Sequence, residues 1–360
     1  MTPSDIPSYR LVNQHIASPR CQDPADVVAW LGAMQGQDYP GAVWSVGLRL
    51  SDAIESSVEQ AFAERKIVRT WMMRGTLHVL AAADVRWMLD LLSPRVIANA
   101  ALRSQRLELD DKVFGRCRKL FTQALKGDRQ LTREAMLALL ERDDISTASQ
   151  RGYHILWRLA QEGLLCFGPR SGKEHTFALL DDWVKPTKPM PREAALAELA
   201  RRYFTSHGPV PLADFIGWSG LKAAEARAGL DAVASKLSKQ TIDGVTYWMP
   251  SNAPESKTKT QSVHLLPGFD EYLLGYKDRN AVLDARHADK IVPGGNGMFL
   301  PTLVIHGRVA GTWKRAVKKK SVVVTVSPFT ALKKAEKEVL AQAAGRYGKF
   351  FGMPAEIALA

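Results

Sequence analysis

Residues 131–184, LTREAMLALLERDDISTASQRGYHILWRLAQEGLLCFGPRSGKEHTFALLDDWV, decide the fold class. Thr132 is a good N-cap for a first helix, and Gly163 suits the left-handed position that ends a second one. The two runs rich in apolar and aromatic residues that follow are typical of strands joined by a polar loop. The expected elements are two helices and two strands, over residues 132–140, 149–162, 164–167 and 175–179. Helix, turn, helix and hairpin in this order predict a winged-helix motif.

The same plan recurs on both sides of this segment. From Pro191 to Met249, helices are expected over 192–205, 212–217 and 222–237, before a strand over 244–248. At the N-terminus, Asp23 and Pro24 form a cap and first-position pair for a helix. There the expected elements are helices over 24–34, 40–48 and 53–65, and a hairpin over 67–80 that turns at Arg74 and Gly75. We therefore expect three tandem winged-helix motifs.

The pattern changes after a polar linker over Ser251–Gln261. Short β-type runs follow at 263–267, 299–305, 307–312 and 321–326, and a helix is expected over 330–347. This pattern predicts a small C-terminal antiparallel β-barrel with a terminal helix. The whole chain is thus predicted to be an α+β protein of four domains, with three winged-helix domains at 1–110, 111–188 and 189–252 and the barrel at 258–360.

The composition is that of a globular protein, with 46% hydrophobic and 24% charged residues. No apolar run approaches the length of a membrane span, and the N-terminus lacks the pattern of a signal peptide. Cys21, Cys117 and Cys166 lie far apart, and the eight histidines are scattered, so no metal site is indicated. We expect a cytoplasmic protein without a cofactor. No exposed apolar interface is identifiable, so we also expect a monomer.

The charge balance points to a polyanion. The net charge is +12 and the isoelectric point is near 9.6, and neutralising phosphates releases condensed counterions. Between Lys290 and Ala335 nine Lys or Arg occur with no acidic residue. Five of them gather at an expected turn between strands: Lys314, Arg315, Lys318, Lys319 and Lys320. The alternative is a solvated basic surface, but we predict contact with the phosphates of double-stranded DNA.

Two further sets of basic side chains are candidate DNA contacts. Arg151, His154 and Arg158 fall on one stripe of the helix expected over 149–162. The alternative is an ordinary solvated helix face. Arg69, Arg74 and His78 lie on the N-terminal hairpin around Trp71, and basic residues interleaved with an aromatic suit a strand pair on a nucleic acid. Trp71 can equally belong to the core.

Gln35 and Gln37 are the candidate catalytic residues. They lie where the first helix should end, since Gly36 weakens a helix and Pro40 disfavours helical geometry at Tyr39. In an extended segment, side chains two residues apart face the same side. Two amides could therefore hold one water molecule, although a pair of helix-ending amides is the simpler alternative.

Glutamine chemistry limits the reaction. Because glutamine has no pKa near neutrality, it cannot act as a strong general base and can only position water for attack on a reactive carbon. A nucleotide whose base is alkylated on a ring nitrogen has such a carbon in its sugar, because the positive charge makes the base a good leaving group from deoxyribose. The sugar would pass through an oxocarbenium-like state.

Five blocks of the sequence resemble the AlkZ-like winged-helix DNA glycosylases: LVNQHIASP (11–19), LGAMQGQDYPGAVWSVGLRL (31–50), RTWMMRGTLHVL (69–80), LLPGFDEYLLGYKDR (265–279) and LPTLVIHGRVAGTWKR (300–315). The resemblance implies three winged-helix motifs, a C-terminal barrel, and excision of alkylated purines or crosslinked bases. It also implies that Gln35 and Gln37 match a Gln-aliphatic-Gln motif that positions the water. Here Gly36 replaces the aliphatic residue, which loosens the backbone between the two amides.

Three functional interpretations remain open at this stage. The first is a monofunctional glycosylase acting on damaged DNA, with no lyase step because no lysine is marked as a nucleophile. The second is a non-enzymatic winged-helix regulator or DNA-architecture protein. The third places acid chemistry on Asp270, Glu271 and Asp278. For these carboxylates a structural role is favoured, with Lys277 and Arg279 as their expected partners.

Overall fold

The computed structural model describes residues 1–252 and 262–360, so most of the linker predicted over Ser251–Gln261 lies outside the described residues. The fold is α+β, as predicted. Contacts group the chain into two compact units, one formed by Met1–Glu59 with Leu196–Ala360 and the other by Gln60–Ala195. This grouping is coarser than the four domains expected from the sequence, whose boundaries stay a prediction.

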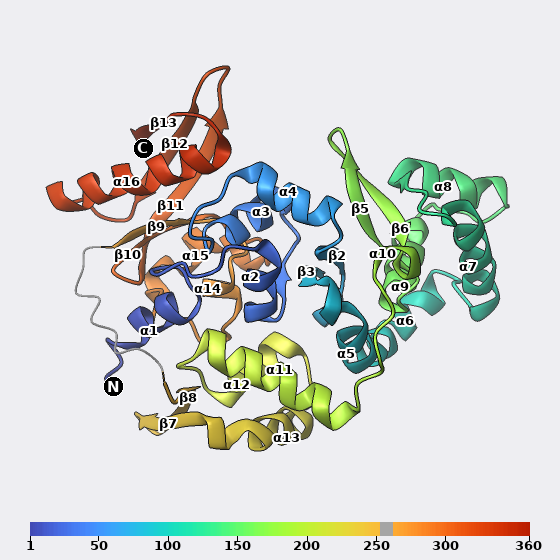
Figure 1. The fold of residues 1–360 in the computed structure, drawn as a ribbon, viewed down its shortest axis with the longest axis horizontal. Helices are drawn as coiled ribbons and strands as arrows, with labels where there is room; N and C mark the ends of the chain where they lie inside the picture. Colours follow the sequence, from blue (N-terminus) through green and yellow to red (C-terminus); the bar gives the residue numbers. More distant parts are fainter. Residues whose placement is uncertain (253–261) are drawn as a thin grey trace. The chain divides into compact units, whose positions relative to one another are not determined.

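The unit formed by Gln60–Ala195 is called the central unit because it holds the middle of the sequence, and it is built around two hairpins (Figure 1). Its strands are β2 (Ile67–Trp71), β3 (Leu77–Ala81), β4 (Leu131–Thr132), β5 (Leu165–Ser171) and β6 (Glu174–Leu179), and they follow the spatial order β3-β2-β5-β6-β4. Its helices are α5 (Val85–Asn99), α6 (Ala101–Arg106), α7 (Asp111–Leu125), α8 (Arg133–Arg142), α9 (Arg151–Gln161) and α10 (Leu180–Trp183). α4 (Glu55–Ala63) crosses the boundary into this unit.

The local signals at 131–184 are confirmed. The Thr132 hydroxyl accepts a hydrogen bond from the Ala135 amide at 3.2 Å and so caps α8. Gly163 has a φ of +76°, the left-handed conformation expected where α9 ends. The hairpin expected over 67–80 also forms, with Ile67 opposite Ala81 and its turn at Arg74 and Gly75. Its strand β2 pairs with β5 of the second predicted wing, so the two hairpins share one sheet and one apolar core.

The other unit combines both ends of the chain. Its helices are α1 (Ile6–Asn13), α2 (Pro24–Leu31), α3 (Tyr39–Gly47), α11 (Arg192–His207), α12 (Leu212–Ser219), α13 (Ala223–Val233), α14 (Glu271–Leu274), α15 (Ala288–Ile291) and α16 (Lys334–Phe351). Its strands are β1 (Met34–Gln35), β7 (Leu237–Ile242), β8 (Val245–Pro250), β9 (Val263–Leu266), β10 (Thr302–Ile305), β11 (Arg308–Val317), β12 (Val322–Pro328) and β13 (Ala355–Leu359). α11 begins in the central unit and ends here.

The predicted C-terminal barrel is wrong in its closure. The strands form an open five-stranded sheet in the order β13-β12-β11-β10-β9, and within the described residues no pairing joins β13 to β9. The sheet is also not wholly antiparallel, because β12 and β13 run parallel, with Val322 opposite Ala355. The terminal helix α16, expected over 330–347, starts and ends four residues later and packs beside the sheet, where Tyr347 contacts Trp44 and Trp313. This helix supplies the apolar cover that closure would otherwise provide.

Candidate functional site

Gln35 and Gln37 lie in a non-helical segment between α2 and α3, as predicted. α2 ends at Leu31, three residues earlier than expected, because Gly32 adopts a φ of +83°. Gln35 closes the short strand β1 and is half-buried, whereas Gln37 is exposed. That the two amides face one spot stays a prediction.

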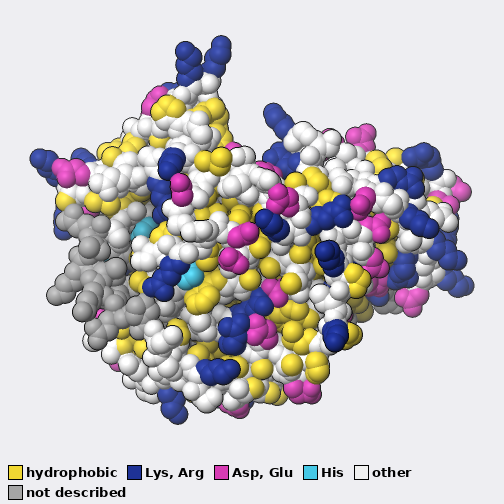
Figure 2. Space-filling view, in the orientation of Figure 1, with side chains coloured by type: hydrophobic (Ala, Val, Ile, Leu, Met, Phe, Trp, Pro, Cys, Tyr) yellow, Lys and Arg dark blue, Asp and Glu magenta, His cyan; other side chains and the backbone are white. Residues whose placement is uncertain are grey.

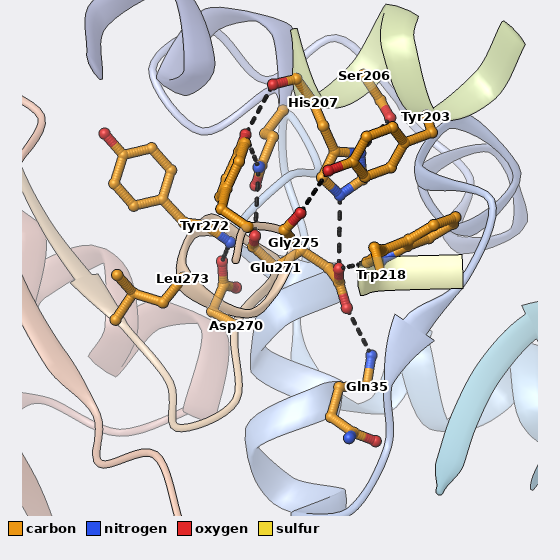
Figure 3. A network of polar contacts seen from close by, with 12 residues as sticks. Gln35, Tyr203, Ser206, His207, Trp218, Asp270, Glu271, Tyr272, Leu273 and Gly275 are labelled. Carbon is orange, nitrogen blue, oxygen red and sulfur yellow. Dashed lines mark hydrogen bonds and ion pairs between the residues drawn. The ribbon is translucent and has the colours of Figure 1, made fainter. Parts of the chain in front are cut away.

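The backbone of Gln35 is held by a residue from far along the chain. Its amide N–H donates to Oε1 of Glu271 at 3.0 Å (Figure 3). The side chain of Gln35 turns away from Glu271, and its Oε1 accepts the Gly36 N–H at 2.9 Å. Downstream, the Tyr39 hydroxyl donates to the Glu59 carboxylate at 2.6 Å, which fixes the start of α3. The motif is therefore tied down on both sides of its flexible glycine.

A pocket of about 430 Å³ opens beside this segment. Asp38, the residue after Gln37, forms part of its wall together with the start of α3. Lys314 and Arg315 from β11 form another part of the wall, and Tyr347 from α16 contributes as well. Tertiary structure thus brings part of the predicted cation cluster next to the predicted catalytic segment, although the two lie near opposite ends of the chain.

The two cations of this pocket differ in how they are held. Lys314 is exposed, whereas Arg315 is half-buried. The guanidinium of Arg315 donates to the Tyr347 hydroxyl at 2.5 Å and lies 5.1 Å from the ring centre of Phe351. Burial raises the pKa of Tyr347 despite the neighbouring Arg315, so its hydroxyl keeps its proton at neutral pH. Arg315 therefore has a fixed position in the wall, and Lys314 carries an exposed charge at its rim.

The remaining lysines of the cluster lie at the turn between β11 and β12, as predicted. Lys318, Lys319 and Lys320 are all exposed, and Figure 2 shows cationic side chains at the tip of this projecting hairpin. Lys318 pairs with Glu356 at 3.1 Å, but both side chains are more than half exposed, so this ion pair is weak. The tip is accessible to a large anionic partner.

On the hairpin of the central unit, the structure argues against two predicted DNA contacts. Arg69 is 5% exposed and its guanidinium lies over the ring of Phe167, 4.7 Å from the centroid. His78 is fully buried, and its Nδ1 lies 3.0 Å from the carbonyl oxygen of Thr76. The two strands pack their side chains on both faces, so the expected exposed face is missing. Arg74 is exposed at the turn and remains a candidate. Trp71 belongs to the core, the alternative considered for it.

The stripe on α9 is engaged within the protein. Arg151 donates to the carbonyl oxygens of Leu107 and Glu108, and Arg158 pairs with Glu162 at 2.6 Å. His154 receives a hydrogen bond from Arg103, and burial together with that arginine lowers its pKa. These half-buried side chains have a clear structural role, and their contact with DNA stays a prediction.

Asp270 and Glu271 contact residues other than the partners expected for them. Asp270 pairs with Arg49 at 2.8 Å, and Glu271 joins a buried network with His207 and Trp218. Asp278 is exposed and caps the Asn280 amide. Arg279, an expected partner, donates instead to the carbonyl oxygen of Leu273. The structural role favoured from the sequence fits these contacts, but sequence spacing gave no sign of the link from Glu271 to Gln35.

Metal clusters and membrane-spanning helices are absent from residues 1–252 and 262–360. In these ranges no group of three or more His, Cys, Asp or Glu side chains is placed to hold a metal ion. Among the described helices, none has the length and apolar character needed to cross a membrane.

Comparisons with a family model, a curated relative and a solved structure all indicate the same family. Residues 28–350 match the family model described as DNA glycosylase AlkZ-like. A curated relative, the interstrand DNA cross-link repair glycosylase of Streptomyces sahachiroi, is 28% identical over 94% of this chain and 95% of its own length. The solved structure of Streptomyces sahachiroi DNA glycosylase AlkZ superposes with a TM-score of 0.79 at 24% identity, covering 99% of this chain and all of that one.

Proposed function

Because the chain belongs to the AlkZ-like DNA glycosylase family, we propose that it hydrolyses the N-glycosidic bond of alkylated purines or crosslinked bases in double-stranded DNA. Gln35 and Gln37 hold the attacking water. The activity of the relative from Streptomyces sahachiroi, cross-link repair, supports this substrate class. We expect the protein to work as a monomer in the cytoplasm. Within the proposed fold, the three winged-helix motifs carry the DNA.

The proposed reaction does not need a strong general base from the protein. A purine alkylated on N7 carries a positive charge, so the bond from N9 to the sugar breaks as the base leaves neutral. The water adds to the anomeric carbon, loses a proton to solvent, and leaves an abasic sugar. Amides suffice because they orient water without needing a pKa near 7. The carbonyl oxygen of Gln35 accepts the Gly36 N–H, and an amide oxygen has two lone pairs.

The observation that carries the proposal is the pocket shared by Asp38 and Lys314. Its volume of about 430 Å³ lies within the range of about 300–1,000 Å³ common for small-ligand sites. We propose that the modified nucleotide lies against this pocket, next to Gln37. Lys314 and the exposed lysines 318–320 then hold the flanking phosphates.

The test is base release from a duplex containing N7-alkylguanine. The Gln35→Ala, Gln37→Ala double variant should lose most of its single-turnover rate while it still binds DNA. Gln123→Ala, an exposed glutamine on α7, serves as the matched control and should release the base normally. Normal release by the double variant would show that the two amides do not position the water.

A further inference from the structure

The carboxylate of Glu271 accepts hydrogen bonds from two separate parts of the chain and contacts a third. Its Oε1 accepts from the Gln35 amide at 3.0 Å, and its Oε2 accepts from Trp218 Nε1 at 2.9 Å and faces His207 Nε2 at 3.4 Å (Figure 3). Glu271 is 2% exposed. It therefore touches no substrate, yet one of its bonds reaches the candidate site directly.

An N–H group faces each oxygen of the carboxylate, the Gln35 amide at Oε1 and the Trp218 indole at Oε2. Burial lowers the pKa of His207, with Glu271 acting in the opposite direction, so the imidazole is neutral at pH 7. The Ser206 hydroxyl lies 2.8 Å from its Nδ1 and 2.8 Å from the carbonyl oxygen of Arg202. A buried group surrounded by donors is satisfied only as an acceptor. The ionised carboxylate, with an acceptor on each side, meets this requirement.

The start of α14, which carries Glu271, is itself fixed. The preceding residue, Asp270, forms two hydrogen bonds with the buried guanidinium of Arg49 and caps α14 through the Tyr272 amide. Within this unit the carboxylate of Glu271 thus has a defined position. The Gln35 amide from which it accepts lies at the end of the two-residue strand β1, directly before Gly36.

From this geometry we infer that Glu271 is a positioning residue, which fixes the Gln35 peptide and thereby directs the Gln35 amide toward the reacting water. The inference rests on the proposed function of Gln35. It also explains how the pair can work with glycine between the two glutamines. Here a hydrogen bond to a buried carboxylate contributes to holding the segment in place.

E271Q is the informative variant because it keeps the shape of the side chain. An amide offers one acceptor and one NH2 group, so it cannot accept on both sides. We expect its carbonyl oxygen to keep the shorter of the two bonds, the one from the Trp218 indole at 2.9 Å. The NH2 group then faces the Gln35 N–H, and the bond to Gln35 is lost. W218F is the matched control, since it removes a different donor to the same carboxylate and leaves the Gln35 bond in place.

The expected result separates positioning from general stability. E271Q should lower kcat by about tenfold to a hundredfold, the size of effect produced by a misplacement of about 1 Å. KM for the damaged duplex should stay within about twofold because Glu271 is buried. W218F should keep kcat near that of the wild type. Hydrogen exchange of a peptide covering residues 34–38 should speed up in E271Q and not in W218F. Thermal unfolding of each variant sets an assay temperature at which all of them are folded.

A double-mutant cycle with Gln35→Ala completes the test. If Glu271 acts through Gln35, E271Q should cost almost nothing further in the Gln35→Ala background. Equal losses of kcat in E271Q and W218F, or a full E271Q loss without Gln35, would overturn the inference while leaving the role of Gln35 intact. Failure of the wild type to release the base overturns the proposed function itself, and normal release by the Gln35→Ala, Gln37→Ala variant overturns the water-positioning role of the two amides, so these failures are distinguishable from failure of the inference.

Discussion

Arg49 and Asp270 form a buried, two-pronged ion pair. Nη1 of Arg49 lies 2.8 Å from Oδ2 of Asp270, Nη2 lies 2.9 Å from Oδ1, and neither side chain is more than 2% exposed. Burial acts to raise the pKa of Asp270, but Arg49 and the Ser45 hydroxyl outweigh it, so the pKa lies below its ordinary value. The pair connects the segment after α3 with the start of α14, which carries Glu271.

Asp270→Asn should therefore destabilise the protein strongly. It leaves the Arg49 charge buried without its counterion, a change that costs about 3–5 kcal/mol in other buried pairs. Urea unfolding at pH 7 measures the loss. Asp284→Asn, which breaks the exposed pair of Asp284 with Arg286, is the control and should change the unfolding free energy little. A small effect of Asp270→Asn would mean that the buried pair adds no net stability.

Removing the charges at the hairpin tip should weaken DNA binding in a salt-dependent way. The triple variant Lys318→Gln, Lys319→Gln, Lys320→Gln should reduce the slope of log K against log salt by up to about 0.9 for each phosphate that is no longer neutralised. Fluorescence anisotropy with a labelled duplex at several salt concentrations measures this slope. The control removes three exposed lysines in or next to α7: Lys112→Gln, Lys119→Gln and Lys126→Gln. Equal slopes for both triple variants would place the tip outside the DNA interface.

His264 should contribute to the pH dependence of the free energy of unfolding. Burial, with a smaller effect of Arg346, lowers the pKa of His264 from 6.5 to about 4. Below pH 6.5 His264 binds a proton in the unfolded chain but stays neutral in the folded protein. Its contribution to the free energy of unfolding is therefore present above pH 6.5 and is lost as the pH falls toward 4. Between pH 7.5 and 5 the loss is about 2 kcal/mol.

His264→Phe removes that titration while keeping a ring in the site. The drop in unfolding free energy between pH 7.5 and 5, measured by urea unfolding, should be smaller in the variant than in the wild type by about the same 2 kcal/mol. Identical drops in both proteins would mean that His264 is protonated as easily in the folded state as in the unfolded chain.

Gly47 should not tolerate a side chain. A Cβ built there would lie 2.1 Å from the ring of Phe350, so α3 and α16 pack too closely for alanine. Gly47→Ala should cost about 1–3 kcal/mol through overpacking. Gly345→Ala is the control, since a Cβ at Gly345 meets nothing within 4 Å and alanine favours a helix. Thermal unfolding should show a lower Tm for the first variant and an equal or higher Tm for the second.

Helix and hairpin signals could be predicted from sequence because they depend on neighbours in the chain. The Thr132 cap, the left-handed Gly163 and the turn at Arg74 and Gly75 are all set by local backbone preferences. The non-helical segment at Gln35 is predictable for the same reason. The overestimate of α2 arose at Gly32, whose positive φ ends the helix before its apolar pattern stops.

Burial and partner choice could not be predicted in the same way. The exposed face expected for Arg69 and His78 is covered, because strands from two predicted motifs form one sheet. The sheet at the C-terminus stays open because α16 covers it and β13 adds a parallel edge strand that the sequence pattern did not reveal.

By itself the sequence determined the α+β class, local features such as the Thr132 cap and the turn at Arg74 and Gly75, the excess of positive charge, and the pair of glutamines at 35 and 37. Only the tertiary structure decided which of these charges are exposed, and that Glu271 holds the Gln35 backbone. The physical reason is range: caps and turns depend on bonds between residues a few positions apart, whereas burial and buried hydrogen bonds depend on segments that meet only when the chain folds.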